Sequence, residues 1–298
     1  MNKPSVINID RIILGDNQFF GVNHMSQDKG TRSYEKFRDL SEIKKIMYCA
    51  LDNGVTGVFF STHPDILNIT NMIRRDPALK NGFSIYVNVP YIVKYVQMLN
   101  EMGLYRSVKS LLKGKTWREN IVYGIRTSIN LIQNDYLGIA DRLIDLELNP
   151  FHDLNVKAVF LHNGLADLAL GYDMANVVRH FYDYIDKRYK LIPAFGTLNF
   201  PLFNQILEKA GISSALVMTS VNKKGFLMNP SKEVCEKAIQ NSDHLILAMG
   251  TLASGSLKPN EAYEYLGFLK RVKHVVVGFS SEEHGIETFQ AIRKYLTK

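Results

Sequence analysis

The sequence lacks long apolar runs and has few cysteines. No apolar run in the 298 residues approaches the roughly 20 residues that a membrane-spanning helix needs, and the first 15 residues contain no apolar signal-peptide segment. The two cysteines, Cys49 and Cys235, belong to no CxxC pair or Cys/His ligand spacing, so neither a disulfide framework nor a zinc site is indicated. We expect both cysteines to be buried in helices. The sequence predicts a cytoplasmic protein with no membrane contact.

Negative charge is also scarce. The chain carries 36 Lys and Arg against 29 Asp and Glu, a formal net charge of +7. This balance fits a small anionic or phosphorylated ligand. The positive charges are dispersed and no recognised nucleic-acid motif accompanies them, so we do not expect nucleic-acid binding.

Short apolar segments alternate with helical patterns along the whole chain. Strict alternation of strand and helix predicts a parallel sheet with helices outside, and eight strands favour closure into a (β/α)8 TIM barrel, a fold of typically about 250 residues. We therefore expect one domain over residues 1–298. The eight predicted strands lie at 11–14, 56–60, 84–89, 157–162, 191–195, 215–219, 244–249 and 274–277. The clearest predicted helix starts after Ser41 and stops at Asn53-Gly54.

Two connections exceed the usual length. Residues 15–40 separate the first strand from its helix, and an insertion at 91–156 separates the third and fourth strands. The insertion is predicted to be helical at 92–102, 105–112 and 117–148. Its middle, YRSVKSLLKGKTWRE, has five basic residues and one acid. A lid, a subunit contact in a homo-oligomer and an ordinary solvated surface are the alternatives.

Glycine and serine follow the last two predicted strands. The loop at 250–255 follows the seventh strand, and Gly278, Ser280 and Ser281 lead from the eighth into a helix that Ser281 is expected to cap. Backbone N–H groups at a helix N-terminus attract anions, and paired phosphate-binding loops recur at these places in (β/α)8 barrels. An ordinary capped turn is the alternative.

Active sites of such barrels form where the strands end. The residues at these ends are polar and mostly uncharged; Asp16 is the clear acid and Asp65 a second candidate, which argues against a carboxylate-rich Mg²⁺ site or a glycosidase pair. Asp16 with His24, His63 and His162 could hold a transition metal, but their spacing is not diagnostic, and no metal is predicted.

Two other kinds of side chain suit catalysis. His162, at the end of the fourth strand, is the best acid–base candidate, with a structural histidine as the alternative. Lys223 and Lys224 follow the sixth strand, where a lysine can form a Schiff base, but their position favours simple surface lysines.

Four segments, VFLHN, FGTLNF, LASGSL and VVGFSSEEHGIETF, resemble in order those of the aldo-keto reductase superfamily. The resemblance covers residues 157–297 well and the first 60 faintly. It implies an oxidoreductase that binds NADP or NAD, with His162 polarising a carbonyl and Asn199 holding the nicotinamide carboxamide. We expect further cofactor contacts at Leu252, Ser254, Gly255, Gly278, Ser280 and Ser281. Asn222, after the sixth strand, is another expected cofactor contact.

The chain departs from that family at its reactive positions. Ser61, Ile66 and Asn88 stand where the family has Asp, Tyr and Lys, and Val221 stands where an aromatic residue stacks on nicotinamide. Leu198 replaces a serine, and no basic residue lies near His284 to grip a 2′-phosphate. The groups left to assist His162 are Asp16, His63, Asn88 and Tyr91.

Three hypotheses follow. The first is a divergent NAD(P)-dependent oxidoreductase acting on a small carbonyl or alcohol. The second is a lyase, aldolase or isomerase of a phosphorylated metabolite, with proton transfer by Asp16, His63 or His162. The third is a ligand-binding barrel without catalysis, and a site with no titratable group of shifted pKa would favour it.

Overall fold

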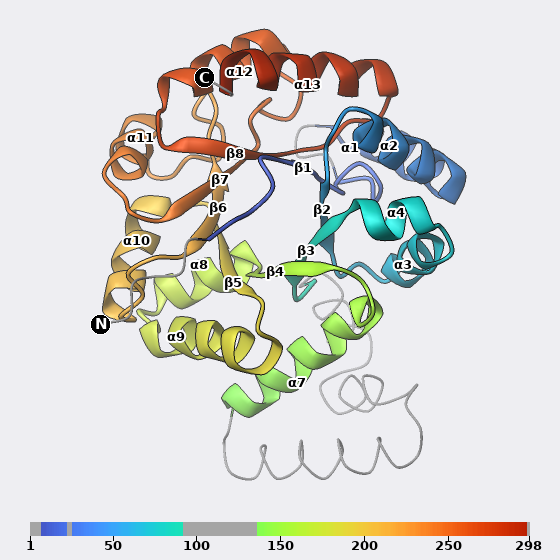
Figure 1. Cartoon of the computed structure of the whole chain (residues 1–298). Helices are drawn as coiled ribbons and strands as arrows, with labels where there is room; N and C mark the ends of the chain where they lie inside the picture. The colour runs from blue at the N-terminus through green and yellow to red at the C-terminus, as the bar shows by residue number, and fades with distance from the viewer. Residues whose placement is uncertain (1–6, 23–25, 92–135, 297–298) are drawn as a thin grey trace, which may run out of the picture.

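The chain forms a closed barrel of eight parallel strands, each paired with the next and the last with the first (Figure 1). The computed structural model describes residues 7–22, 26–91 and 136–296. Helices surround the strands, as the alternating pattern predicts. The strands are β1 (Ile12–Leu14), β2 (Gly57–Ser61), β3 (Ser84–Val89), β4 (Val156–Leu161), β5 (Ile192–Thr197), β6 (Leu216–Ser220), β7 (Leu245–Met249) and β8 (Val272–Val277).

The helices lie between these strands and after the last. In chain order they are α1 (Gln27–Phe37), α2 (Leu40–Asp52), α3 (Ile66–Arg74), α4 (Pro77–Gly82), α7 (Tyr136–Leu148), η1 (Asn149–Phe151), α8 (Asn163–Gly171), α9 (Ala175–Tyr184), η2 (Ile185–Tyr189), α10 (Phe200–Lys209), α11 (Lys232–Gln240), α12 (Pro259–Phe268) and α13 (Glu282–Leu296). None of the helices in these described stretches is both long and apolar enough to cross a membrane.

Alternate residues of each strand face the barrel interior. Phe59, Tyr86 and Phe160 belong to one apolar cluster inside the barrel, while their strand neighbours pack in a second cluster under the helices. Because side chains alternate along a strand, Ser61 and Asn88, two residues beyond Phe59 and Tyr86, also face inward at the carboxyl end.

Local signals place most helix ends. Ser231 caps α11 by accepting a hydrogen bond from the Val234 amide, and Gly54 follows α2 with a positive φ of 68°. The prediction that α2 starts after Ser41 was wrong, because Asp39 is the N-cap and accepts from the Ser41 amide. Cys49 and Cys235 are buried within α2 and α11, as predicted, and their thiols donate to the Glu282 and Asn229 carbonyls.

The two long connections contain helices. Residues 15–40, predicted to be a connection, include α1. Of the insertion at 91–156, the structure describes α7 and the residues that follow it. The predicted helices at 92–102 and 105–112, and the first part of 117–148, lie outside the described residues. Its role as a lid or subunit contact stays a prediction.

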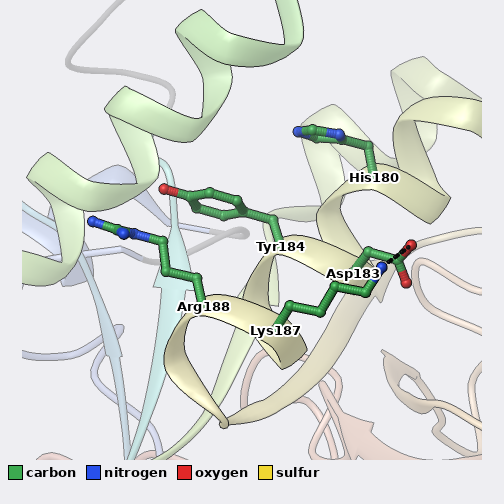
Figure 2. A pocket seen from close by; sticks show the side chains of 5 residues that line it. All are labelled: His180, Asp183, Tyr184, Lys187 and Arg188. Atoms are coloured by element: carbon green, nitrogen blue, oxygen red, sulfur yellow. Dashed lines mark hydrogen bonds and ion pairs between the residues drawn. The ribbon is translucent and has the colours of Figure 1, made fainter.

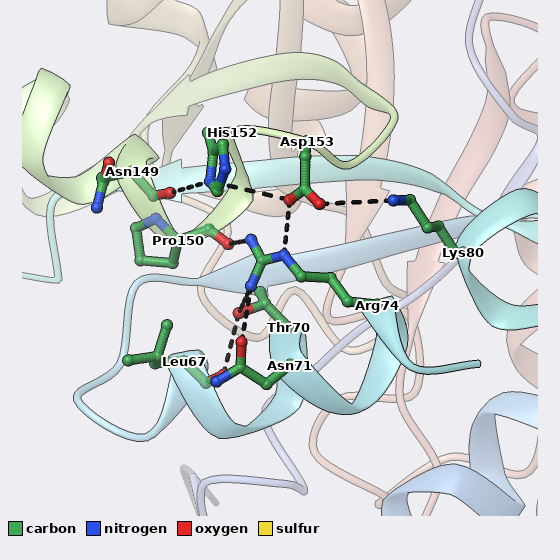
Figure 3. A network of polar contacts seen from close by, with 9 residues as sticks. All are labelled: Leu67, Thr70, Asn71, Arg74, Lys80, Asn149, Pro150, His152 and Asp153. Atoms are coloured by element: carbon green, nitrogen blue, oxygen red, sulfur yellow. Dashed lines mark hydrogen bonds and ion pairs between the residues drawn. The ribbon is translucent and has the colours of Figure 1, made fainter. Parts of the chain in front are cut away.

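A polar network ties α3 and α4 to the chain before β4, at the amino end of the barrel (Figure 3). The Arg74 guanidinium donates to Asp153 at 2.6 Å and also to the Pro150 carbonyl and Asn71. Lys80 reaches the other Asp153 oxygen at 3.5 Å. Residues at this end of a (β/α)8 barrel serve stability rather than chemistry.

We expect Arg74→Ala to lower the free energy of unfolding by about 1 to 3 kcal/mol, because several charge-assisted hydrogen bonds are lost at once. Urea denaturation measures this loss. Lys80→Ala is the matched control and should cost less than about 1 kcal/mol, since that pair is long and more exposed. Equal losses in the two variants would contradict this reading of the network.

Candidate functional site

Asp16 is a buried carboxylate at the carboxyl end of the barrel. Only 2% of its surface is exposed, and its Oδ2 accepts a hydrogen bond from the Ser61 amide at 2.6 Å. Burial raises the pKa of Asp16 to about 6, against the opposing effect of that hydrogen bond. A carboxyl group with such a pKa can both give and take a proton near neutral pH.

Asn88 lies on β3, next to β2, and faces the barrel interior. It pairs in register with Ser61, whose amide holds Asp16. The residue is 6% exposed, and its Oδ1 is buried with no hydrogen-bond partner in the described part of the chain. The side chain therefore has an unused acceptor among these polar residues.

His63 and Tyr91 complete a group that we call the β1–β3 cluster (Asp16, His63, Asn88 and Tyr91). The His63 ring stacks on Phe20 at a centroid distance of 4.2 Å and meets the edge of Tyr91 at 5.1 Å. Its Nδ1 accepts from the Asp65 amide, and burial lowers the pKa of His63. Burial, with the nearby charge of Asp16, raises the pKa of Tyr91. Tyr91 therefore keeps its proton at neutral pH.

His162 follows β4 and is the N-cap of α8. Its Nδ1 accepts a hydrogen bond from the Gly164 amide at 3.0 Å, and burial lowers the pKa of His162. A neutral imidazole whose Nδ1 accepts must carry its proton on Nε2. His162 is thus both a helix cap and a source of one Nε2–H donor.

The segment after β5 is organised by Asp167, a residue of α8. The carboxylate of Asp167 accepts from the Thr197 hydroxyl and from the Leu198 amide at 3.0 Å, and burial raises the pKa of Asp167. Asn199 uses its Oδ1 to accept from the Leu202 amide at the start of α10. Only the side-chain NH₂ of Asn199 is left to hold an amide oxygen of a ligand.

Asn222 serves the loop after β6. Its Oδ1 accepts from the Phe226 amide and its Nδ2 donates to the Phe226 carbonyl, both at 2.8 Å. The side chain is fully buried. Since both ends are used within the chain, we leave Asn222 out of the proposed site.

The β7 loop (residues 250–258) is compact. Ala253, Ser254 and Gly255 have positive φ values of 46°, 56° and 82°. The Gly255 and Leu257 amides both donate to the Leu252 carbonyl, so much of the loop's donor capacity is consumed internally. The exposed Lys224 side chain donates to the Ser256 carbonyl at 3.0 Å, which places a cation beside this loop.

The β8 loop (residues 278–281) is more open. Within the described residues, the amides of Ser280, Ser281, Glu282 and Glu283 have no hydrogen-bond partner, as expected for a helix N-terminus. Ser281 accepts from the His284 amide, as a cap should. The Lys36 side chain donates to the Ser280 carbonyl at 2.7 Å, so a lysine also adjoins this loop.

Gly278 permits a close approach of the β1 loop. A Cβ added at Gly278 would lie 2.1 Å from Gln18 Oε1. Gln18 in turn donates to the Gly15 carbonyl. The glycine at the end of β8 thus lets the chain after β1 pack against the β8 loop.

A separate hollow of about 310 Å³ lies on α9 and η2, outside the barrel (Figure 2). The lining residues are His180, Asp183, Tyr184, Lys187 and Arg188. Asp141 and Asp145 on α7 bind several of them. Because η2 leads into the amino end of β5, this hollow lies away from the carboxyl ends of the strands, and its lining includes no residue of the β1–β3 cluster.

The described residues offer no metal centre. No three His, Cys, Asp or Glu side chains among them are arranged to hold a metal ion. His24, one of the four candidates, lies outside the described residues. Lys223 forms an exposed ion pair with Glu261, so its position fits a surface lysine.

Sequence reasoning missed three contributors to this end of the barrel. Phe20 could have been suspected from its place just after Asp16. Asp167 and Lys36 lie within helices, and no local pattern distinguishes them from ordinary surface residues. Their contacts to Thr197 and Ser280 join residues 30 and 244 positions apart.

Solved structures share this architecture. A proposed aldo-keto reductase from Pseudomonas aeruginosa matches with a TM-score of 0.60 and 11% identity, covering 96% of this chain and 91% of that one. An aldo-keto reductase from a Medee basin deep-sea metagenome library matches with a TM-score of 0.53 and 12% identity, over 95% and 86% of the two chains. A proposed 2,5-diketo-D-gluconic acid reductase B matches with a TM-score of 0.54 and 10% identity, over 96% and 83%.

At the level of sequence, no protein-family model and no curated protein matches the chain. Identities this low carry a statement about fold alone. The predicted (β/α)8 fold is confirmed: the chain forms the closed barrel shared with these solved structures.

Proposed function

We propose that this protein is an NAD(P)-dependent oxidoreductase that interconverts a small carbonyl compound and its alcohol. One observation carries the proposal. The β1–β3 cluster, in which Asp16 and Asn88 are buried, and the His162 donor share the carboxyl end of the barrel with the two loops that follow β7 and β8. Proton transfer and anion binding would thus occupy neighbouring halves of one site at the carboxyl end of the barrel, where active sites of this fold usually form.

The loops fit a dinucleotide in part. Open amides at the start of α13 suit one phosphate group, and Lys36 and Lys224 add positive charge beside the two loops. The β7 loop, with Leu252, Ser254 and Gly255, would cover the pyrophosphate mainly by shape, since it uses many of its own amides. When bound, nicotinamide supplies or accepts the hydride.

The chain's own groups handle the carbonyl oxygen. The Nε2–H group of His162 would donate a hydrogen bond to that oxygen and so polarise the carbonyl. Asp16, in its protonated form, would deliver the proton that converts the resulting alkoxide into an alcohol. Asn88, His63 and Tyr91 would orient the substrate. This assignment replaces the missing tyrosine–lysine pair with a carboxyl group.

Titration of the purified protein with NADH and with NADPH tests the proposal. We expect saturable binding, followed by nicotinamide fluorescence and weakened by inorganic phosphate. Binding that leads to reduction of small aldehydes or ketones would support the oxidoreductase. If neither NADH nor NADPH binds, the oxidoreductase proposal is refuted.

A second candidate is a lyase or isomerase of a phosphate ester. The specific observation in its favour is that open amides are found at the β8 loop, while the β7 loop is largely closed on itself, which suits one phosphate better than two. The same titration separates the candidates. Thermal stabilisation by phosphate esters without dinucleotide binding would favour the second. The cytoplasmic location and a homo-oligomeric state stay predictions.

A further inference from the structure

The Asn88 side chain has a buried acceptor that the described chain does not use. The residue is 6% exposed, and its Oδ1 lacks any partner in the described residues. A buried carbonyl without a partner is costly, so in folded proteins such a group usually meets a donor from water or a ligand. Its position at the carboxyl end of β3, facing inward, puts it where ligands bind in this fold.

The surroundings indicate which ligand supplies the donor. β3 lies next to β2 and β4 in the barrel and is separated from β8 by two strands and from β7 by three. The donor should therefore belong to the substrate, beside the His162 and Asp16 groups, rather than to a cofactor held by the β7 and β8 loops.

The polarity of the cluster favours a neutral donor. Burial holds the pKa of both His63 and His162 below the usual histidine value, so these rings are uncharged near neutral pH. Asp16 also carries its proton for part of the population at that pH. An ammonium group would find few fixed negative charges here, whereas a hydroxyl group needs one acceptor and one donor.

We propose that the Asn88 amide oxygen accepts a hydrogen bond from a substrate hydroxyl group, so that the preferred substrate is a hydroxylated carbonyl compound with its hydroxyl next to the reactive carbonyl. The statement about the carbonyl rests on the proposed function. The statement about the hydroxyl rests on Asn88 itself.

Hydroxyacetone and acetone, which differ by one hydroxyl group, are the probes. We expect the wild-type protein with reduced dinucleotide to show a kcat/KM about 10- to 100-fold higher for hydroxyacetone, since a site built to bind a hydroxyl discriminates against its absence. Asn88→Leu, of similar size but without an acceptor, should bring this ratio close to one. Asn155→Leu, a matched change at the amino end of the barrel, should leave the ratio unchanged.

Thermal unfolding supplies a readout without turnover. Asn88→Leu should raise the melting temperature of the free protein by about 2 °C, because an unsatisfied polar group is removed. Asn155→Leu should lower it, because Asn155 donates to the Phe83 carbonyl. Hydroxyacetone should raise the melting temperature of the wild type more than acetone does. In Asn88→Leu, the two compounds should raise the melting temperature equally.

The outcomes separate the two claims. If no dinucleotide binds, but hydroxyacetone stabilises the wild type selectively and loses this selectivity in Asn88→Leu, the oxidoreductase is refuted and the hydroxyl site stands. If hydroxyacetone and acetone behave alike in the wild type, or if Asn88→Leu keeps the wild-type selectivity, the hydroxyl site is overturned. In that case, water or the chain itself donates the hydrogen bond to Asn88 Oδ1.

Discussion

Asp16→Asn is expected to lower kcat for carbonyl reduction by about 10²- to 10⁴-fold, the usual effect of removing a positioned proton donor. Asparagine has nearly the same shape and can still accept the Ser61 hydrogen bond, but it cannot deliver a proton. Dinucleotide affinity should change little, because the β7 and β8 loops are untouched. Steady-state kinetics and fluorescence titration on the same preparation measure both quantities.

The matched control is Asp10→Asn, at the opposite end of the barrel. The Asp10 carboxylate accepts from Thr56 and Tyr86 and pairs with Lys157. Burial on its own would raise the pKa of Asp10, but the three contacts together hold this pKa below its usual value. This variant should lose stability while kcat stays within a few-fold of wild type. A kcat in Asp16→Asn as high as in this control would exclude Asp16 as the proton donor.

The same residue gives a pH signature in stability. Because the pKa of Asp16 is about 6 when folded and 3.8 is its ordinary value, the folded protein binds more protons than the unfolded chain between those pH values. Stability from this group is therefore highest below pH 4 and declines as the pH rises towards 6. Two pKa units correspond to about 3 kcal/mol.

Asp16→Asn should consequently gain up to about 3 kcal/mol at pH 7 relative to wild type, since a neutral amide avoids the cost of a buried charge. Urea denaturation at pH 4, 5, 6 and 7 measures this difference. A difference between the two proteins that does not grow with pH would show that the Asp16 carboxyl titrates normally. A gain in stability with a loss of activity is the pattern expected of a functional residue.

NADH is expected to bind at least about 10-fold more tightly than NADPH, which corresponds to about 1.4 kcal/mol. The resemblance of VVGFSSEEHGIETF to the adenosine-phosphate segment of aldo-keto reductases implies that the adenosine end of the cofactor would lie at the β8 loop. The first turn of α13 carries the exposed carboxylates of Glu282 and Glu283. A 2′-phosphate would bring two further negative charges close to them, and the preference should weaken at high salt.

Charge reversal at these two positions tests the preference. Glu282→Lys/Glu283→Lys should shift the ratio of NADPH to NADH affinity by about 100-fold, since two repulsive contacts become attractive. Glu208→Lys/Glu264→Lys makes the same change in net charge on α10 and α12 and should leave the ratio unaltered. Fluorescence titration at two salt concentrations measures both ratios. A wild type that prefers NADPH would place the adenosine end elsewhere.

Local patterns were sufficient for the barrel. Apolar segments bounded by glycine and polar residues predicted eight strands, and the range 84–89 agrees with β3 at both ends. These features depend on neighbours within a few residues, so a sequence displays them directly.

The candidate site was predicted less completely. His162 and Asp16 were correctly placed at strand ends, since a strand end can be recognised locally. Whether Asn222 faces a ligand or its own loop could not be inferred, because that depends on the fold of residues 222–226. The choice of Asp39 rather than Ser41 as the cap of α2 was also missed, because these residues lie two positions apart and have comparable capping ability.

The sequence by itself thus determined the strand order, the parallel barrel and the polar character of its carboxyl end. Only the tertiary structure decided which of these polar groups have partners. It brought the Ser61 amide to Asp16 across 45 residues, and left Asn88 Oδ1 with no partner in the described chain. Proton affinity and hydrogen-bonding capacity follow from burial and from such distant contacts, and neither is encoded in a local pattern.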